Sequence, residues 1–127
     1  MSLEQGIYDR IRTDAAAIAI VPAASMFGAR PKNDVAFPRV TFFEVSDTPD
    51  TGGAFDTEFQ IDCWAKTRAT VKSFNARMWA LLDQQPLTGT PERRVDVVRV
   101  LSTQVSYDTD EDVFQGITRV WIRSYPA

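Results

Sequence analysis

The chain of 127 residues is long enough for one domain and too short for two ordinary ones, so we expect a single domain over residues 1–127. The 14 basic and 17 acidic residues give a formal net charge of −3, which argues against a general nucleic-acid binder and against a basic membrane anchor. The absence of histidine and the single cysteine, Cys63, exclude Ser-His-Asp and Cys-His catalysis, an internal disulfide and the common zinc sites.

The N-terminal segment predicts two helices. Ser2 stands three residues before Gln5, which is the spacing of a capping box. A core stripe follows, in which apolar residues recur every four positions: Leu3, Ile7 and Ile11. A second, short helix is expected from residue 13 or 14 to Ile20, because Pro22 then stops it.

The apolar run 15–24 does not resemble a signal peptide, because acidic rather than basic residues precede it. No run in the chain reaches the roughly 18 apolar residues that a membrane span needs. We therefore expect a protein that remains in the cytosol and does not enter a membrane.

Residues 39–65 predict a long β-hairpin. The segment before it, 23–37, is expected to be a loop with one short strand near 25–29. Segment 39–47 is rich in β-branched and aromatic residues, and a turn follows at 48–54. From 57 to 65 the chain alternates strictly, with Phe59, Ile61, Cys63 and Ala65 on one side and Glu58, Gln60, Asp62 and Trp64 on the other.

The rest of the chain predicts a second long helix and a second hairpin. Thr67 is expected to cap a helix that ends near Asp83 and buries Val71, Phe74, Met78, Leu81 and Leu82. Strands Val95–Tyr107 and Val113–Tyr125 follow, with Asp108–Asp112 as their tip. Short tips rather than crossover helices join the strands, which predicts an α+β fold: a mainly antiparallel sheet built from two β-hairpins, with two helices packed on one face.

The last strand is apolar on both faces. Val120 and Ile122 occupy one face, and the other carries Ile117, Trp121 and Tyr125. A single helix layer buries only one face of a small sheet, so the surplus face suggests a protein partner. Trp64, which alternates away from the core, is either a further interface residue or is covered by a neighbouring helix.

Two acidic segments stand out. The first is the tip 108–112, which contains Asp108, Asp110, Glu111 and Asp112 and begins with the spacing of a calcium-binding EF-hand loop. The rest of the EF-hand pattern is missing, because Val113 and Arg119 occupy the positions where that loop needs Gly and Glu. We therefore favour a solvated hairpin tip, with a charged contact as the alternative. Segment 44–62 holds six acidic residues and no basic one, which indicates either a solvated strand face or a surface for a basic partner; the six are Glu44, Asp47, Asp50, Asp56, Glu58 and Asp62.

No pattern in the chain indicates an enzyme. Phosphate-binding loops, nucleophile elbows and Walker motifs are missing, and the cluster of Arg93, Arg94 and Arg99 is too small to bind nucleic acid by itself. Cys63 alternates into the core, where burial raises a thiol pKa and makes it unreactive. We expect no catalytic residue, no metal site and no cofactor.

Several stretches together resemble a known family. They are the opening Ser2-Leu3-Glu4 with Ile7-Tyr8, the segment Phe37-Pro38-Arg39-Val40-Thr41-Phe42, the strand Phe59-Gln60-Ile61-Asp62-Cys63-Trp64-Ala65 that leads into a helix, and Gly116-Ile117-Thr118-Arg119-Val120-Trp121-Ile122 near the end. In their order and in their local sequences they resemble the tail-completion, or tail-terminator, proteins of long-tailed phages, prophages and gene transfer agents.

The resemblance implies a structural role in the virion tail. Such proteins form a ring, typically of six subunits, on the head-proximal end of the tail tube. The ring stops tube growth and joins the tail to the head connector, and DNA passes through its lumen without specific binding. Assembly takes place in the host cytoplasm, and the partners are further copies of the chain, the tube protein and the connector protein.

A head-to-tail ring needs two different matching patches on each subunit. We take Trp64, Ile117, Trp121 and Tyr125 as candidate interface residues. The acidic loops are candidates for facing the lumen or a partner, where negative charge would repel DNA phosphates; they hold Asp47, Asp50, Asp56, Asp108, Asp110, Glu111 and Asp112.

Two other functions stay open at this stage. One is a different component of the head–tail connector, which is also structural but occupies another place in the stack. The other is a small ligand-binding α+β domain, for which a concave pocket with converging polar groups would be the sign.

Overall fold

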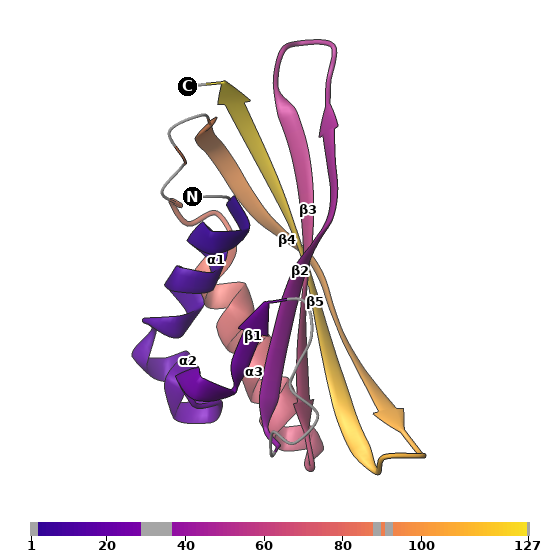
Figure 1. The fold of residues 1–127 in the computed structure, drawn as a ribbon. Coiled ribbons are helices and arrows are strands. Elements are labelled where there is room, and N and C mark those ends of the chain that lie inside the picture. Colours follow the sequence, from indigo (N-terminus) through magenta and orange to yellow (C-terminus); the bar gives the residue numbers. More distant parts are fainter. Residues whose placement is uncertain (1–2, 29–36, 88–89, 91–92, 127) are drawn as a thin grey trace.

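A computed structural model gives the fold and describes residues 3–28, 37–87, 90 and 93–126 (Figure 1). Its helices and strands, in chain order, are α1 (Leu3–Arg12), α2 (Ala15–Ile20), the 3-10 turn η1 (Ala23–Ser25), β1 (Met26–Gly28), β2 (Arg39–Pro49), β3 (Phe55–Ala65), α3 (Arg68–Leu82), β4 (Arg93–Asp108) and β5 (Val113–Pro126). The predicted α+β class is confirmed, and the short helix expected before Pro22 is α2. Ser2, on which the capping-box prediction depends, lies outside the described residues.

The sheet has the strand order β1-β2-β3-β5-β4. The two predicted hairpins, β2–β3 and β4–β5, join along an antiparallel β3–β5 pairing that runs from Phe55↔Ser124 to Ala65↔Phe114. The short strand β1 lies parallel to β2 at the edge. The central strands therefore come from different hairpins, and each hairpin contributes one outer strand.

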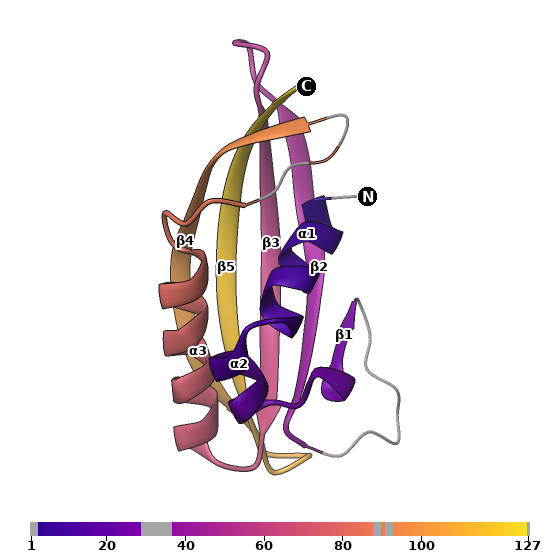
Figure 2. The same cartoon turned by 90° about the vertical axis from the view of Figure 1, so that its left-hand side faces the viewer.

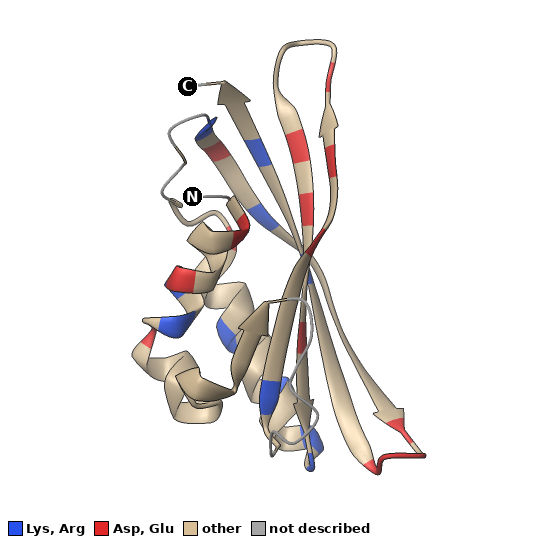
Figure 3. Ribbon diagram, viewed as in Figure 1, with Lys and Arg blue, Asp and Glu red and all other residues tan. Residues whose placement is uncertain are grey.

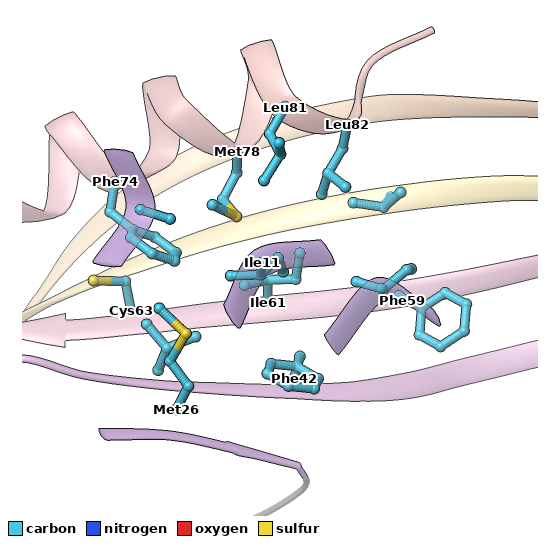
Figure 4. Packing of buried hydrophobic residues seen from close by; sticks show 14 of the residues in the cluster. Ile11, Met26, Phe42, Phe59, Ile61, Cys63, Phe74, Met78, Leu81 and Leu82 are labelled. Atoms are coloured by element: carbon cyan, nitrogen blue, oxygen red, sulfur yellow. The ribbon is translucent and has the colours of Figure 1, made fainter. Parts of the chain in front are cut away.

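All three helices lie on one face of the sheet (Figures 1 and 2). The predicted stripes point inward, because Leu3, Ile7 and Ile11 of α1 are at most 6% exposed. The core between the layers includes Phe42, Phe59 and Ile61 from the sheet and Phe74, Met78 and Leu82 from α3 (Figure 4). Each such side chain contributes roughly 1.5–3 kcal/mol of transfer free energy when it is fully buried. Within the described ranges, no helix lies on the opposite face of the sheet, which we call the helix-free face.

The helices are fixed by caps that also connect elements. Asp14 caps α2 by accepting a hydrogen bond from the Ala17 backbone N–H. Arg77 of α3 donates two hydrogen bonds, of 2.7 and 2.8 Å, to the same carboxylate. These contacts, chiefly the Arg77 bonds, lower the pKa of Asp14. Thr67 caps α3 as predicted, with its hydroxyl accepting from the Thr70 N–H.

Gly116 of β5 is the point of closest approach between α3 and the sheet. A Cβ atom at this position would lie 2.5 Å from Val71 Cγ1 and 2.6 Å from Asn75 Oδ1. Asn75, which is 5% exposed, donates a hydrogen bond to the Gln104 carbonyl and accepts one from the Thr118 hydroxyl. This buried amide links α3 to both strands of the second hairpin.

Candidate assembly surfaces

The helix-free face of the sheet carries the four predicted interface residues. Trp64 of β3 stands beside Gln115, and Ile117, Trp121 and Tyr125 follow at every fourth position along β5. All four side chains are half-buried. Trp64 alternates with the core residues Cys63 and Ala65, and it therefore lies on the face of the sheet opposite the three described helices. The four residues share a face but are spread along the length of β5 rather than gathered in one patch.

Charged side chains separate these aromatic and aliphatic residues. Arg119 lies 3.5 Å from Glu58, and Arg123 lies 3.0 Å from Asp50 and 3.6 Å from Asp56. Arg123 also stands over the Trp121 ring, at 5.8 Å from its centre. The face is thus a mixed surface of rings and ion pairs, and each exposed pair adds little to the stability of the monomer.

Asp62, one of the six acidic residues of segment 44–62, is buried on this helix-free face. It is 5% exposed and lies between Thr41 of β2 and Ile117 of β5. Gln60 Nε2 donates to its carboxylate at 3.0 Å. Burial raises the pKa of Asp62 in spite of this hydrogen bond. The alternation of residues along one strand does not reveal this burial.

Four of the six acidic residues of the β2–β3 hairpin pair with arginines elsewhere in the chain: Asp47, Asp50, Asp56 and Glu58. Figure 3 shows where the acidic and basic residues lie along the strands. Arg93 binds Asp47 with two hydrogen bonds of 2.6 and 2.7 Å, and Thr57 donates a third. The Arg93 bonds lower the pKa of Asp47. Asp50 shapes the turn by accepting from the N–H groups of residues 52 and 54 while it pairs with Arg123. Segment 44–62 contains no basic residue, but the fold brings Arg93 and Arg123 next to its carboxylates.

The acidic tip of the β4–β5 hairpin, 108–112, is more exposed. Asp108 accepts from the backbone N–H groups of Asp110 and Glu111, and Asp112 accepts from the Tyr107 hydroxyl. Glu111 lies 3.8 Å from Arg39, and this is the one ion pair that the tip makes among the described residues. The carboxylates of this tip mostly face solvent.

The two acidic tips lie at opposite ends of the sheet (Figures 1 and 3). They do not converge on a common site, and the described residues contain no group of three or more Cys, Asp or Glu side chains that could hold a metal ion. An open groove of about 490 Å³ beside α1 is lined in part by Asp9 and Asp14, which already pair with Gln5 and Arg77. Cys63 is fully buried, and burial raises its pKa to about 12.

A model of the family described as Tail completion protein gp17 matches residues 5–125. The chain belongs to this family. It is a structural protein of a phage or phage-like tail, which confirms the family suggested by the resemblance.

A solved structure shares the fold of this tail completion protein. One chain of a structure described as the virion of a native gene transfer agent particle superimposes with a TM-score of 0.83 at 21% identity. The match covers 99% of this chain and 96% of that chain. None of the curated proteins searched matches significantly. No helix in the described part of the tail completion protein is long and apolar enough to cross a membrane.

Proposed function

We propose that this tail completion protein forms a ring on the head-proximal end of the tail tube, ends tube polymerisation and joins the tail to the head connector. The ring contains several copies of the chain, six according to the family resemblance. The chain assembles in the host cytoplasm and ends in the virion tail. It works by binding and shape, without catalysis.

The helix-free face of the sheet is the observation that carries this proposal. Its residues Trp64, Ile117 and Trp121 are only half-buried, and the helices lie entirely on the other side. Large rings beside arginines are typical of surfaces that become buried in protein contacts. A subunit that meets its neighbours, the tube and the connector needs several such surfaces, and this fold offers a face, two sheet edges and two hairpin ends.

We also propose that the acidic loops face the lumen or a partner. Of the two loops, the tip with Asp108, Asp110, Glu111 and Asp112 fits better, because Asp47, Asp50 and Asp56 already have arginine partners. Unbalanced negative charge at a lumen repels DNA phosphates and lets the genome slide past.

Electron microscopy of particles from a strain that lacks this gene tests the proposal. We expect overlong, headless tails beside separate filled heads, and normal particles when the wild-type gene is supplied on a plasmid. A matched pair of plasmids supplies Trp121→Asp, on the helix-free face, and Ile18→Asp, an exposed apolar residue of α2. The first is expected to fail and the second to restore joined particles.

The other outcomes have definite meanings. Tails of normal length that do not join heads would assign the protein to another component of the head–tail connector. Unchanged infectious particles would refute both structural roles and would leave a ligand-binding domain as the candidate.

A further inference from the structure

Asp62 is a buried carboxyl on the central strand of the sheet. Its strand, β3, lies between β2 and β5, and Asp62 is in register with Thr41 on one side and Ile117 on the other. Asp62 is 5% exposed and Thr41 is 4% exposed. An aspartate is rarely buried to this extent unless it is paired with a cation. Among the described residues, Asp62 is the one acidic side chain that is buried.

Neutral amides rather than cations bind the Asp62 side chain. Gln60 Nε2 lies 3.0 Å from one carboxylate oxygen and 3.3 Å from the other, and the Gln115 side chain also favours the ionised form by hydrogen bonding. None of the ion pairs among the described residues includes Asp62. An amide donor offsets only part of the free energy that a carboxylate loses when it leaves water.

Arg119 of β5 is the cation whose charge acts on Asp62. It stands beside Gln60, the next residue of β3 on the helix-free face. Its guanidinium lies 3.5 Å from Glu58, so its charge is already paired with another carboxylate. Arg119 favours the ionised form of Asp62, but burial is the larger effect and raises the pKa of Asp62 above its ordinary 3.8.

The other neighbours of Asp62 do not neutralise it. Arg39 of β2, one residue further along the helix-free face in the other direction, lies 3.8 Å from Glu111. Beyond β5, the β4 residue of the same row is the uncharged Gln104. Cys63 points to the opposite face, and its pKa of about 12 keeps the thiol neutral at acidic and neutral pH. The ionised form of Asp62 is therefore buried without a cation of its own.

We propose that Asp62 is an acid-responsive switch in the helix-free face: it takes up a proton as the solution is acidified, and the neutral carboxyl stabilises the centre of the sheet against unfolding. The protonated group still accepts from Gln60 through its carbonyl oxygen, but it no longer carries a charge that burial opposes. The switch is a property of the single chain, so it does not depend on the proposed ring.

The expected response of Asp62 to acid is opposite to that of Asp47 on the neighbouring strand β2. A carboxyl whose pKa is raised by folding costs stability at neutral pH, and this cost disappears as the pH falls through the raised pKa toward the unfolded value. The bonds from Arg93 lower the pKa of Asp47 instead. The contribution of Asp47 is therefore present at neutral pH and is lost as the pH falls through its lowered pKa.

Urea unfolding of the purified full-length chain over a range of pH tests the proposal, with Asp62→Asn and Asp47→Asn as a matched pair. Each variant removes a carboxyl and keeps its shape. The quantity compared is the unfolding equilibrium constant of wild type divided by that of the variant. For Asp62→Asn we expect this ratio to fall in acid, by at most about tenfold per pH unit between the raised pKa and 3.8. For Asp47→Asn we expect the ratio to rise.

Gln60→Leu provides a second readout. This substitution removes the amide that favours the ionised form, so the pKa of Asp62 should rise further. When Asp62→Asn is compared with wild-type Asp62 in the Gln60→Leu background, we expect the ratio to begin its fall at a higher pH. NMR titration of the Asp62 carboxyl carbon in wild type makes the same test without a variant, and we expect a midpoint above 3.8.

The contrary results are distinct. A ratio for Asp62→Asn that does not change with pH, or a midpoint at or below 3.8, would overturn the switch. A ratio that rises in acid, as for Asp47→Asn, would also overturn it, because a cation would then be stabilising the ionised carboxyl. These results leave the proposed ring untouched, since the deletion strain tests it separately.

Discussion

The two hairpin ends of the sheet are both acidic, yet they are held in different ways. At the β2–β3 end, Arg93 and Arg123 reach across from the other hairpin and bind Asp47, Asp50 and Asp56. The β4–β5 tip has one long ion pair at 3.8 Å and is secured instead by packing, where Gly116 lets α3 touch the sheet. One end is neutralised by the fold, and the other presents its charge to the surroundings.

A run of acidic residues in the sequence therefore does not by itself create an acidic surface. The arginines that bind Asp47 and Asp50 are 46 and 73 residues away from them in the chain. They reach the carboxylates because β5 pairs with β3 and carries β4 beside it. Whether a carboxylate faces a partner is therefore decided by the strand order.

We expect the largest effect from overpacking the contact between Gly116 of β5 and α3. Gly116→Val places methyl groups where Val71 and Asn75 already lie, so we expect the free energy of unfolding to fall by about 1–3 kcal/mol. Urea denaturation followed by tryptophan fluorescence measures it. Gly28→Ala is the matched control, because its new Cβ would meet Glu4 at an ordinary 3.7 Å. Equal stability of the two variants would contradict the packing argument.

Removing Arg93 tests the charge anchor at the other end. Arg93→Ala removes the two hydrogen bonds that Arg93 donates to Asp47. We expect the free energy of unfolding to fall by about 1 kcal/mol at neutral pH. The pair lowers the pKa of Asp47 below its ordinary 3.8, so its contribution is present above that value and is lost as the pH falls through the lowered pKa. Unfolding curves of wild type and variant should therefore converge in acid; a constant difference would assign the loss to packing.

Charge reversal at the exposed tip should separate assembly from stability. Asp110→Lys/Glu111→Lys changes side chains that face solvent, so we expect the free energy of unfolding to stay within about 0.5 kcal/mol of wild type. If the tip faces the lumen or a partner, genome delivery per assembled particle falls. Normal assembly and delivery would refute that placement of the tip.

The smallest expected effect is a titration shift within the tip. The Tyr107 hydroxyl donates to Asp112, and this bond raises the pKa of Tyr107 above its ordinary 10.0. Asp112→Asn removes the charge, so the pKa should fall toward 10.0 in an ultraviolet titration of tyrosinate. Asp110→Asn is the control, because Asp110 does not contact the hydroxyl. An unchanged titration in Asp112→Asn would mean that the tip does not hold this bond in solution.

Much of the fold could be predicted from local patterns. Alternation in 57–65 identified both faces of β3, and the four-residue spacing of α1 identified its buried stripe. Thr67 was recognisable as a helix cap because capping depends on neighbours in sequence, whereas the cap of the short helix, Asp14, was not singled out. The parallel pairing of β1 with β2 and the antiparallel pairing of β3 with β5 were not predictable, since they depend on contacts between distant segments.

The candidate surfaces were predictable in part, for the same reason. Ile117, Trp121 and Tyr125 were assigned to the correct face because strand alternation determines it. The burial of Asp62 and Asn75 was missed. For Asn75 it depends on contacts with Gln104 and Thr118, which are distant in the sequence. The β2–β3 register shifts between Glu44 and Ser46, and the β4–β5 register shifts between Val100 and Ser102. These irregularities gave no signal, because a single extra residue does not disturb the composition of a strand.

The pairing of β3 with β5 has a consequence for synthesis of the chain on the ribosome. β3 lies at the centre of the sheet, but its partner β5 is translated after every other helix and strand of the fold. Until β5 emerges, β3 retains an unpaired edge and the first hairpin lacks Arg123. A chain cut short before Val113 cannot complete this layer, so truncated translation products are expected to be degraded rather than built into a particle.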